Sequence, residues 1–143
     1  MNRSICPDAI AYVRGANLRG VVKFFQRPCG TLVTADIRGL PQNGKTGFFA
    51  FHIHEGGSCE GPGFSQTGNH FNPKNEPHPL HAGDLPPLLE NRGRAYLQVL
   101  TERFRVEEII GRTVVIHSGP DDFSTQPSGN PGSKIACGVI RRL

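Results

Sequence analysis

The sequence has no tryptophan, one methionine and four cysteines among its 143 residues. Four cysteines are too few for a disulfide-stapled scaffold, although they allow one bridge or a metal site. No apolar run approaches the roughly 18 residues of a membrane span, and residues 1–6 do not include the apolar region of a signal peptide. We therefore expect no membrane span and, by default, a cytoplasmic location.

Clusters of one charge sign are also absent. The net charge is +4 at pH 7, and the 16 lysines and arginines are scattered along the chain. Scattered basic residues do not favour nucleic acid as the leading partner, so we expect neither a nucleic-acid nor a membrane partner. A small anion remains a possible ligand.

Apolar residues at helical spacing are missing, whereas alternation with a period of two is frequent. The 18 glycines and 12 prolines favour short strands joined by turn-rich loops. Strands are expected at residues 9–14, 19–26, 31–38, 47–55, 93–101, 112–118 and 133–140. Several short strands at this spacing predict an all-β Greek-key sandwich or barrel, with residues 1–143 forming a single domain.

Two segments interrupt this rhythm, at residues 56–91 and 119–132. Both are long, polar and rich in glycine and proline, and loops of this length in a compact domain are usually functional or disordered. The first holds three of the six histidines, which argues against disorder.

Residues 39–46, GLPQNGKT, match the phosphate-binding pattern G-x-x-x-x-G-K-[ST]. That site needs a helix to begin at the lysine, so that backbone N–H groups face the phosphates. The segment that follows, residues 47–54, alternates like a strand. The match therefore predicts a hairpin turn rather than a phosphate site.

The histidines are grouped in a way that suggests a metal site. His52 and His54 are two apart on an expected strand, so their side chains share one face, roughly 7 Å apart at Cα. Alone, such a pair could equally be solvated. The other four histidines and one nearby aspartate are His70, His78, His81, Asp84 and His117. Imidazole and carboxylate ligands suit zinc, copper, iron or nickel, and the spacing leaves open whether one metal or two is bound.

Five segments resemble the copper/zinc superoxide dismutase family, in family order from about residue 47 to the end. They are FHIHE at 51–55, GNHFNP at 68–73, HAGDL at 81–85, GRTVVIH at 111–117 and GNPGSKIACGVI at 129–140. The resemblance implies a β-sandwich. It also implies conversion of superoxide to dioxygen and hydrogen peroxide by copper redox cycling, with a structural zinc. The alternative is a non-catalytic copper- or zinc-binding module of the same fold.

The resemblance also implies which residues hold the metals. Copper would be held by His52, His54, His70 and His117, and zinc by His70, His78, His81 and Asp84. Eight ligand positions with one aspartate leave seven imidazole contacts for six histidines, so one histidine must bridge. His70 is the implied bridge. Its copper bond is expected to break on reduction, when its nitrogen takes up a proton.

Further implied roles concern residues around the metals. Asp121 matches a carboxylate that joins a copper histidine to a zinc histidine, although it or Asp122 could be a solvated loop carboxylate. Lys134 stands where the family has an arginine that guides the anion. Lysine lacks the planar fork of arginine, so we expect slower turnover than with arginine.

The cysteines divide into two groups under the same resemblance. Cys59 and Cys137 match the family's intrachain disulfide, the alternative being two reduced thiols. Cys6 and Cys29 have no matching role and are expected to be small buried hydrophobic residues. The resemblance leaves the oligomeric state open, with a homodimer as one option.

Overall fold

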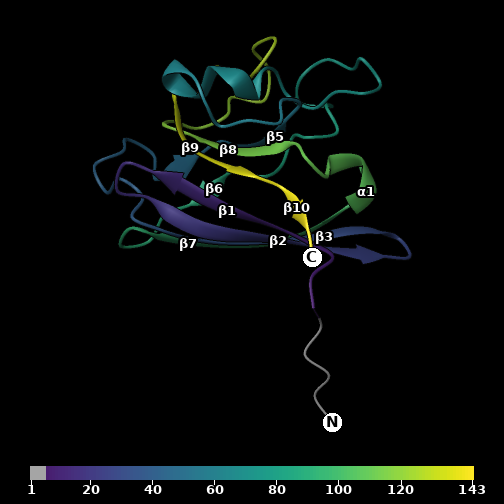
Figure 1. Cartoon of the computed structure of the whole chain (residues 1–143). Coiled ribbons are helices and arrows are strands. Elements are labelled where there is room, and N and C mark those ends of the chain that lie inside the picture. Colours follow the sequence, from purple (N-terminus) through teal and green to yellow (C-terminus); the bar gives the residue numbers. More distant parts are fainter. Residues whose placement is uncertain (1–5) are drawn as a thin grey trace.

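The computed structural model describes residues 6–143, and strands dominate it (Figure 1). Most of the segment on which the signal-peptide expectation rests, residues 1–5, lies outside the described residues. No helix in residues 6–143 combines the length and apolar character needed to cross a membrane. The elements are β1 (Ala9–Gly15), β2 (Arg19–Arg27), β3 (Gly30–Arg38), β4 (Phe48–Phe49), β5 (Phe51–His54), η1 (Pro62–Thr67), β6 (Leu88–Leu89), β7 (Arg94–Thr101), α1 (Val106–Ile109), β8 (Thr113–His117), β9 (Lys134–Val139) and β10 (Arg141–Arg142).

The main sheet is antiparallel and has the strand order β5-β8-β9-β1-β2-β3-β7, with β10 pairing with β1. The strands β1, β2 and β3 follow one another as hairpins, after which the chain crosses to the far edge and later returns to place β7 beside β3. Figure 1 shows the sheet curling over, so that β5, β8 and β9 form a layer above β1, β2, β3 and β7. This crossing, two-layered sheet confirms the predicted all-β Greek-key class.

The hydrophobic core lies between the two layers. Because side chains alternate along a strand, every second residue of β1, β2 and β3 points inward, and the residues between them face solvent. The core residues of the two layers include Ala11, Val13, Val22, Phe24, Val33, Ala35, Ile37, Phe51, Ile53, Val114 and Ile116. The same alternation places His52 and His54 on the opposite face of β5 from Phe51 and Ile53, away from this core.

The strand expected at residues 47–55 is broken at Ala50. Its first part, β4, pairs with β6, whereas its second part, β5, pairs with β8. Ala50 keeps both backbone hydrogen bonds, donating to the Gly119 oxygen at 2.8 Å and accepting from the His117 nitrogen at 2.9 Å. The short strand β6 was not predicted, because it lies within the polar segment 56–91.

Two smaller predictions need correction. Residues 39–46 precede a strand rather than a helix, as expected, but they do not form a hairpin turn. The reason is that β3 pairs with β2 and β7, whereas β4 pairs with β6, so the segment connects different sheets. Cys6 and Cys29 are exposed rather than buried, because Cys29 lies in the β2–β3 turn and Cys6 precedes β1.

Candidate metal centre

All six histidines meet on one face of the upper layer. Two come from β5 and one from the end of β8, while the segment 56–91 folds back over β5 and supplies the other three. Isolated antiparallel bridges join His54 to His70 and His52 to Asp84, which fixes this segment against the strand. The buried polar residues of the centre are His52, His54, His70, His78, His81, His117 and Asp121.

One group of ligand atoms belongs to His52, His54, His70 and His117, all within 4.8 Å of one another. The Nδ1 atom of His54 lies 2.9 Å from the Gly68 oxygen, which can only accept, so the proton of a neutral His54 is on Nδ1. Its Nε2 atom therefore presents a lone pair, 3.3 Å from Nε2 of His117. Converging imidazole nitrogens of this kind suit a metal cation.

Three nitrogen atoms of this group have no hydrogen-bond partner among the described residues. These are Nδ1 of His52, Nε2 of His70 and Nδ1 of His117, all buried. Buried polar atoms are nearly always satisfied, so an orphan needs an explanation. A metal ion bound between the four imidazoles would satisfy Nδ1 of His52 and Nε2 of His70, so the donor set fits a metal.

A second group contains His70, His78, His81 and Asp84. The carboxylate of Asp84 is the centre of this group. It lies 2.8 Å from Nδ1 of His70, 3.1 Å from Nδ1 of His78 and 3.3 Å from Nδ1 of His81. Three imidazoles and one carboxylate match the four-ligand composition of a closed zinc site. His70 thus presents Nδ1 to this group and Nε2 to the other.

Asp121 hydrogen-bonds to one histidine of each group. Its two oxygens lie 2.8 Å from Nε2 of His52 and 2.7 Å from Nε2 of His78. A carboxylate on the second nitrogen fixes the tautomer and orientation of a metal-binding imidazole. The neighbouring Asp122 is exposed, and among residues 6–143 its carboxylate bonds only to Ser124 and Thr125 of its own loop.

Gly129 allows the loop of residues 119–132 to pack against this carboxylate. A Cβ atom at position 129 would lie 2.0 Å from Oδ1 of Asp121 and 2.6 Å from Nε2 of His78. The backbone of Gly129 also has a φ of 81°, in the left-handed region that favours glycine. Both observations require a residue without a side chain here.

The protonation of the centre suits metal binding. Burial lowers the pKa of His54 to about 2 and that of His117 to about 3. Burial acts to raise the pKa of Asp121, but its hydrogen bonds with His52 and His78 outweigh that effect and hold the pKa well below its ordinary value. Near pH 7 His54 and His117 are therefore neutral, the form of imidazole that binds metals, and Asp121 is ionised.

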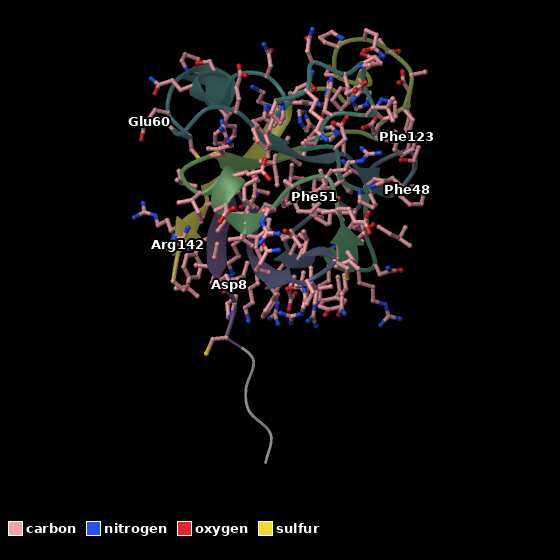
Figure 2. All side chains as sticks on the ribbon, turned by 90° about the vertical axis from the view of Figure 1, so that its right-hand side faces the viewer. Asp8, Phe48, Phe51, Glu60, Phe123 and Arg142 are labelled. Carbon is pink, nitrogen blue, oxygen red and sulfur yellow. A yellow bond between two sulfur atoms is a disulfide. The ribbon has the colours of Figure 1, made fainter. Side chains whose placement is uncertain are left out.

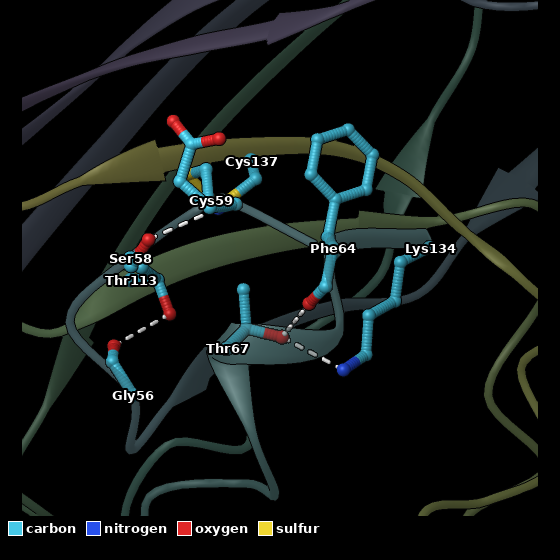
Figure 3. Close-up of a disulfide and its surroundings, with 9 residues drawn as sticks. Gly56, Ser58, Cys59, Phe64, Thr67, Thr113, Lys134 and Cys137 are labelled. Atoms are coloured by element: carbon cyan, nitrogen blue, oxygen red, sulfur yellow. Dashed lines mark hydrogen bonds between the residues drawn. A yellow bond between two sulfur atoms is a disulfide. The ribbon is translucent and has the colours of Figure 1, made fainter. Parts of the chain in front are cut away.

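Lys134, the first residue of β9, lies at the mouth of the first group. Its Nζ atom donates to Oγ1 of Thr67 at 2.7 Å and to the Gly68 oxygen at 3.2 Å, and Figure 3 shows the contact with Thr67. It lines a surface hollow together with His54, His70 and His117. Burial lowers the pKa of Lys134. One of its three N–H bonds is left for a ligand.

Three contacts fix the loops that carry the ligands. The predicted disulfide between Cys59 and Cys137 is confirmed, and it ties the first loop to β9 (Figure 3). Arg103 donates from Nη1 to the backbone oxygens of Pro79 at 2.7 Å and His81 at 3.2 Å. The Gln126 side chain accepts from the His78 nitrogen and donates to the His78 oxygen.

The roles of Arg103, Gln126 and Gly129 were not predicted. Arg103 and Gln126 hydrogen-bond to backbone atoms of the segment that contains His78 and His81. Gly129 matters because it has no side chain to collide with Asp121 and His78. No residue type or spacing in the sequence signals such contacts.

Comparison with known proteins places this centre in a family. Residues 18–140 match the family described as Copper/zinc superoxide dismutase (SODC). Superoxide dismutase [Cu-Zn] 2 of Aquifex aeolicus is 36% identical, over 99% of this chain and 92% of its own length. Superoxide dismutase [Cu-Zn] of Legionella pneumophila is 35% identical, over 85% of this chain and 77% of its own length.

A solved structure has the same architecture. The crystal structure of the clock protein EA4 superimposes with a TM-score of 0.84 and 33% identity, and the match covers 100% of both chains. The matching family, the relatives and the two groups of buried ligands agree with one another. The chain belongs to the copper/zinc superoxide dismutase family.

Proposed function

We propose an assignment of ligands and roles for this chain as a superoxide dismutase with copper and zinc as cofactors. The copper ligands are His52, His54, His70 and His117, and the zinc ligands are His70, His78, His81 and Asp84. The observation that carries the assignment is that His70 belongs to both groups, with a different nitrogen directed to each. A non-catalytic metal-binding module is not favoured, because the copper group lacks none of its four imidazoles.

Copper supplies the redox chemistry when bound: it accepts an electron from one superoxide, which leaves as dioxygen, and donates an electron to the next, which leaves as hydrogen peroxide with two protons. The remaining steps belong to the side chains of this chain.

Lys134 attracts and orients the anion. Its position in the hollow beside His54 and His117 and its remaining N–H bond support this role. A cation at the mouth of a site raises the local concentration of an anionic substrate and its rate of association. Because two of its N–H bonds are held by Thr67 and Gly68, the ammonium group keeps a fixed position.

His70 supplies a proton. Its Nε2 atom has no partner within the described residues, so it can hold a proton whenever it is not bound to copper. On the other side of the ring, Asp84 lies 2.8 Å from Nδ1 and keeps the ring in place. We propose that this proton goes to the reduced substrate and that water supplies the second.

The assignment is tested by metal content and magnetic coupling. One copper and one zinc per chain, with loss of superoxide in the same sample, are expected. When cobalt replaces zinc, a shared imidazole brings two paramagnetic ions into contact, so the copper resonance signal should weaken strongly. The His70→Ala variant should keep a normal copper signal beside cobalt. An undiminished copper signal in the cobalt form of the unaltered chain would show that His70 does not bridge.

We also propose that two copies of the chain associate through an apolar patch. The residues proposed for it are the exposed side chains of Phe48 and Leu89, and those of Leu100 and Phe123, which line one hollow. Phe48 pairs with Leu89, and Figure 2 shows Phe48 and Phe123 on the same side of the molecule. Contiguous exposed apolar surface marks an interaction site in soluble proteins.

Light scattering tests this association. It should give a dimer for the unaltered chain and a monomer for Leu89→Lys with Phe123→Lys. A monomer for the unaltered chain would overturn this proposal.

A further inference from the structure

Four arginines lie side by side across the outer face of the lower layer, far apart in the sequence. Arg14 of β1 pairs with Arg19 of β2. Arg38 of β3 pairs with Arg19 on one side and with Arg94 of β7 on the other. Since neighbouring strands are about 4.8 Å apart, the row is about 14 Å long. We refer to these four residues as the arginine row.

Within the part of the chain that the structure describes, one carboxylate, Asp36, lines the hollow beside the arginine row, and it forms no ion pair with the row. All four side chains are exposed, and none forms an ion pair or a side-chain hydrogen bond with residues 6–143. Like charges directly opposite each other destabilise a sheet. Four exposed arginines beside one unpaired carboxylate leave a net positive surface that an anionic partner would complement.

The surface beside the row is hollowed and aromatic. Arg14, Arg19 and Arg38 line a depression that also contains Tyr12 and Tyr96. These are the chain's two tyrosines, with exposed fractions of 60% and 68%. The register places Tyr12, Val21, Asp36 and Tyr96 in the next row across the same four strands. In Figure 2, nitrogen-tipped side chains project from the blue strands at the bottom of the molecule.

We propose that this face binds single-stranded nucleic acid. Guanidinium groups in a row bind successive backbone phosphates, and an exposed aromatic ring offers a stacking platform for a base. Asp36 lies in the same hollow, where its carboxylate can accept a hydrogen bond from the amino group of a base. The combination is typical of sheet faces that bind single strands, in which aromatic residues stack two or three bases.

The same residues argue against two other anionic partners. A phospholipid surface would not enter a hollow, and neither lipid phosphate nor a sulfated polysaccharide gains from the carboxylate of Asp36. Both also lack the planar bases that two exposed tyrosines can stack. The arginine row alone would suit any polyanion, so the tyrosines and Asp36 decide the class of partner.

This face is separate from the metal centre. The arginine row belongs to the layer of β1, β2, β3 and β7, whereas the histidines lie on β5, β8 and the loops above them (Figure 1). Substitutions in the row should therefore leave superoxide dismutation intact. That activity serves as a check that each variant is folded and loaded with metal.

The test is fluorescence anisotropy of a labelled oligothymidine of about 15 nucleotides, within the usual range for such sites. The metal-loaded chain should bind it, and if three guanidinium groups each neutralise one phosphate, the slope of log K against log salt should be about −2. Arg19→Gln with Arg38→Gln should weaken binding about tenfold or more at low salt.

The matched control is Lys45→Gln with Lys74→Gln, which removes the same charge from exposed loop positions outside this face. It should change the affinity less than twofold. Tyr12→Ala with Tyr96→Ala keeps all charges and should weaken binding about tenfold, the effect of losing base stacking. Superoxide dismutation and thermal stability should stay close to those of the unaltered chain in all three variants.

Three results would overturn the proposal. The first is no binding of the oligonucleotide at low salt. The second is equal loss in the arginine variant and the lysine control, which would show attraction to net charge alone. The third is tighter binding of heparin or of vesicles with anionic lipid, lost in the arginine variant but unchanged in the tyrosine variant. That result would assign the face to a polyanion without bases.

Discussion

The two oxygens of Asp121 hydrogen-bond to histidines of two different metal groups, Oδ2 to His52 at 2.8 Å and Oδ1 to His78 at 2.7 Å. Both histidines use Nε2 for this contact, which leaves Nδ1 of each directed toward a metal position. One carboxylate thus sets the tautomer of a proposed copper ligand and of a proposed zinc ligand at once.

Replacing this carboxylate by an amide should weaken zinc binding. In Asp121→Asn one oxygen becomes an NH₂ group, which cannot accept from the Nε2–H of either imidazole, so one ring loses its partner. We expect zinc affinity to fall by about 10- to 100-fold, measured by competition with a chelator. Asp122→Asn is the matched control, because Asp122 contacts only its own exposed loop. Equal zinc affinity in the two variants would contradict the role of Asp121.

Lys134 should make the activity sensitive to alkaline pH. Burial disfavours the charged form and lowers the pKa of Lys134 below 10.5, so its positive charge is lost as pH rises through that lowered value. Lys134→Arg stays charged and should hold its activity over that range. Near pH 7 the arginine variant should turn over about twofold to tenfold faster at low salt, and Lys134→Gln about tenfold slower.

Pulsed generation of superoxide with spectroscopic detection measures both effects. Lys45→Arg, an exposed change elsewhere, is the control and should follow the unaltered chain at every pH. Identical rates at low salt for Lys134→Arg, Lys134→Gln and the unaltered chain would remove Lys134 from the reaction.

The disulfide should contribute strongly to stability, because 78 residues separate Cys59 from Cys137. Closing a loop of that length reduces the entropy of the unfolded chain and stabilises the fold by about 4 kcal/mol in the chain-entropy account. Cys59→Ser with Cys137→Ser should lower the melting temperature by about 10 °C in calorimetry. Cys6→Ser with Cys29→Ser, at the two free exposed cysteines, should change it by less than about 2 °C.

Replacing Arg103 should lower the affinity for zinc more than the affinity for copper. Its guanidinium group donates to the backbone oxygens of Pro79 and His81, so it fixes the short turn between two of the proposed zinc ligands. In Arg103→Gln these bonds are lost, and we expect zinc affinity to fall about fivefold, the effect of about 1 kcal/mol. Copper content should stay the same. Arg105→Gln is the control, since Arg105 is exposed and pairs with Glu107; an equal fall in both variants would contradict the prediction.

The sequence predicted those parts of the fold that depend on local pattern. The strands expected at 9–14, 19–26 and 31–38 correspond to β1, β2 and β3, because alternation directly reflects which side chains reach the core. The break at Ala50 was not predictable, since alanine fits the alternation and the change of partner strand depends on the whole sheet.

Features that depend on register or on backbone contacts also escaped prediction. The arginine row is scattered over positions 14 to 94 in the sequence, and only the pairing of β1, β2, β3 and β7 aligns its members. In the sequence these arginines therefore count only as scattered basic residues. The grouping of histidines was visible in the sequence, by contrast, because side-chain chemistry and short spacing express it directly.

The packing at Gly129 limits how this chain can vary over evolution. The loop of residues 119–132 contains two serines and a threonine whose side chains could be exchanged for others of similar polarity. At position 129 even one added carbon atom would overlap a carboxylate oxygen. A position with no reactive group is therefore constrained alongside Asp121, and a comparison of sequences that searched only for chemistry would overlook it.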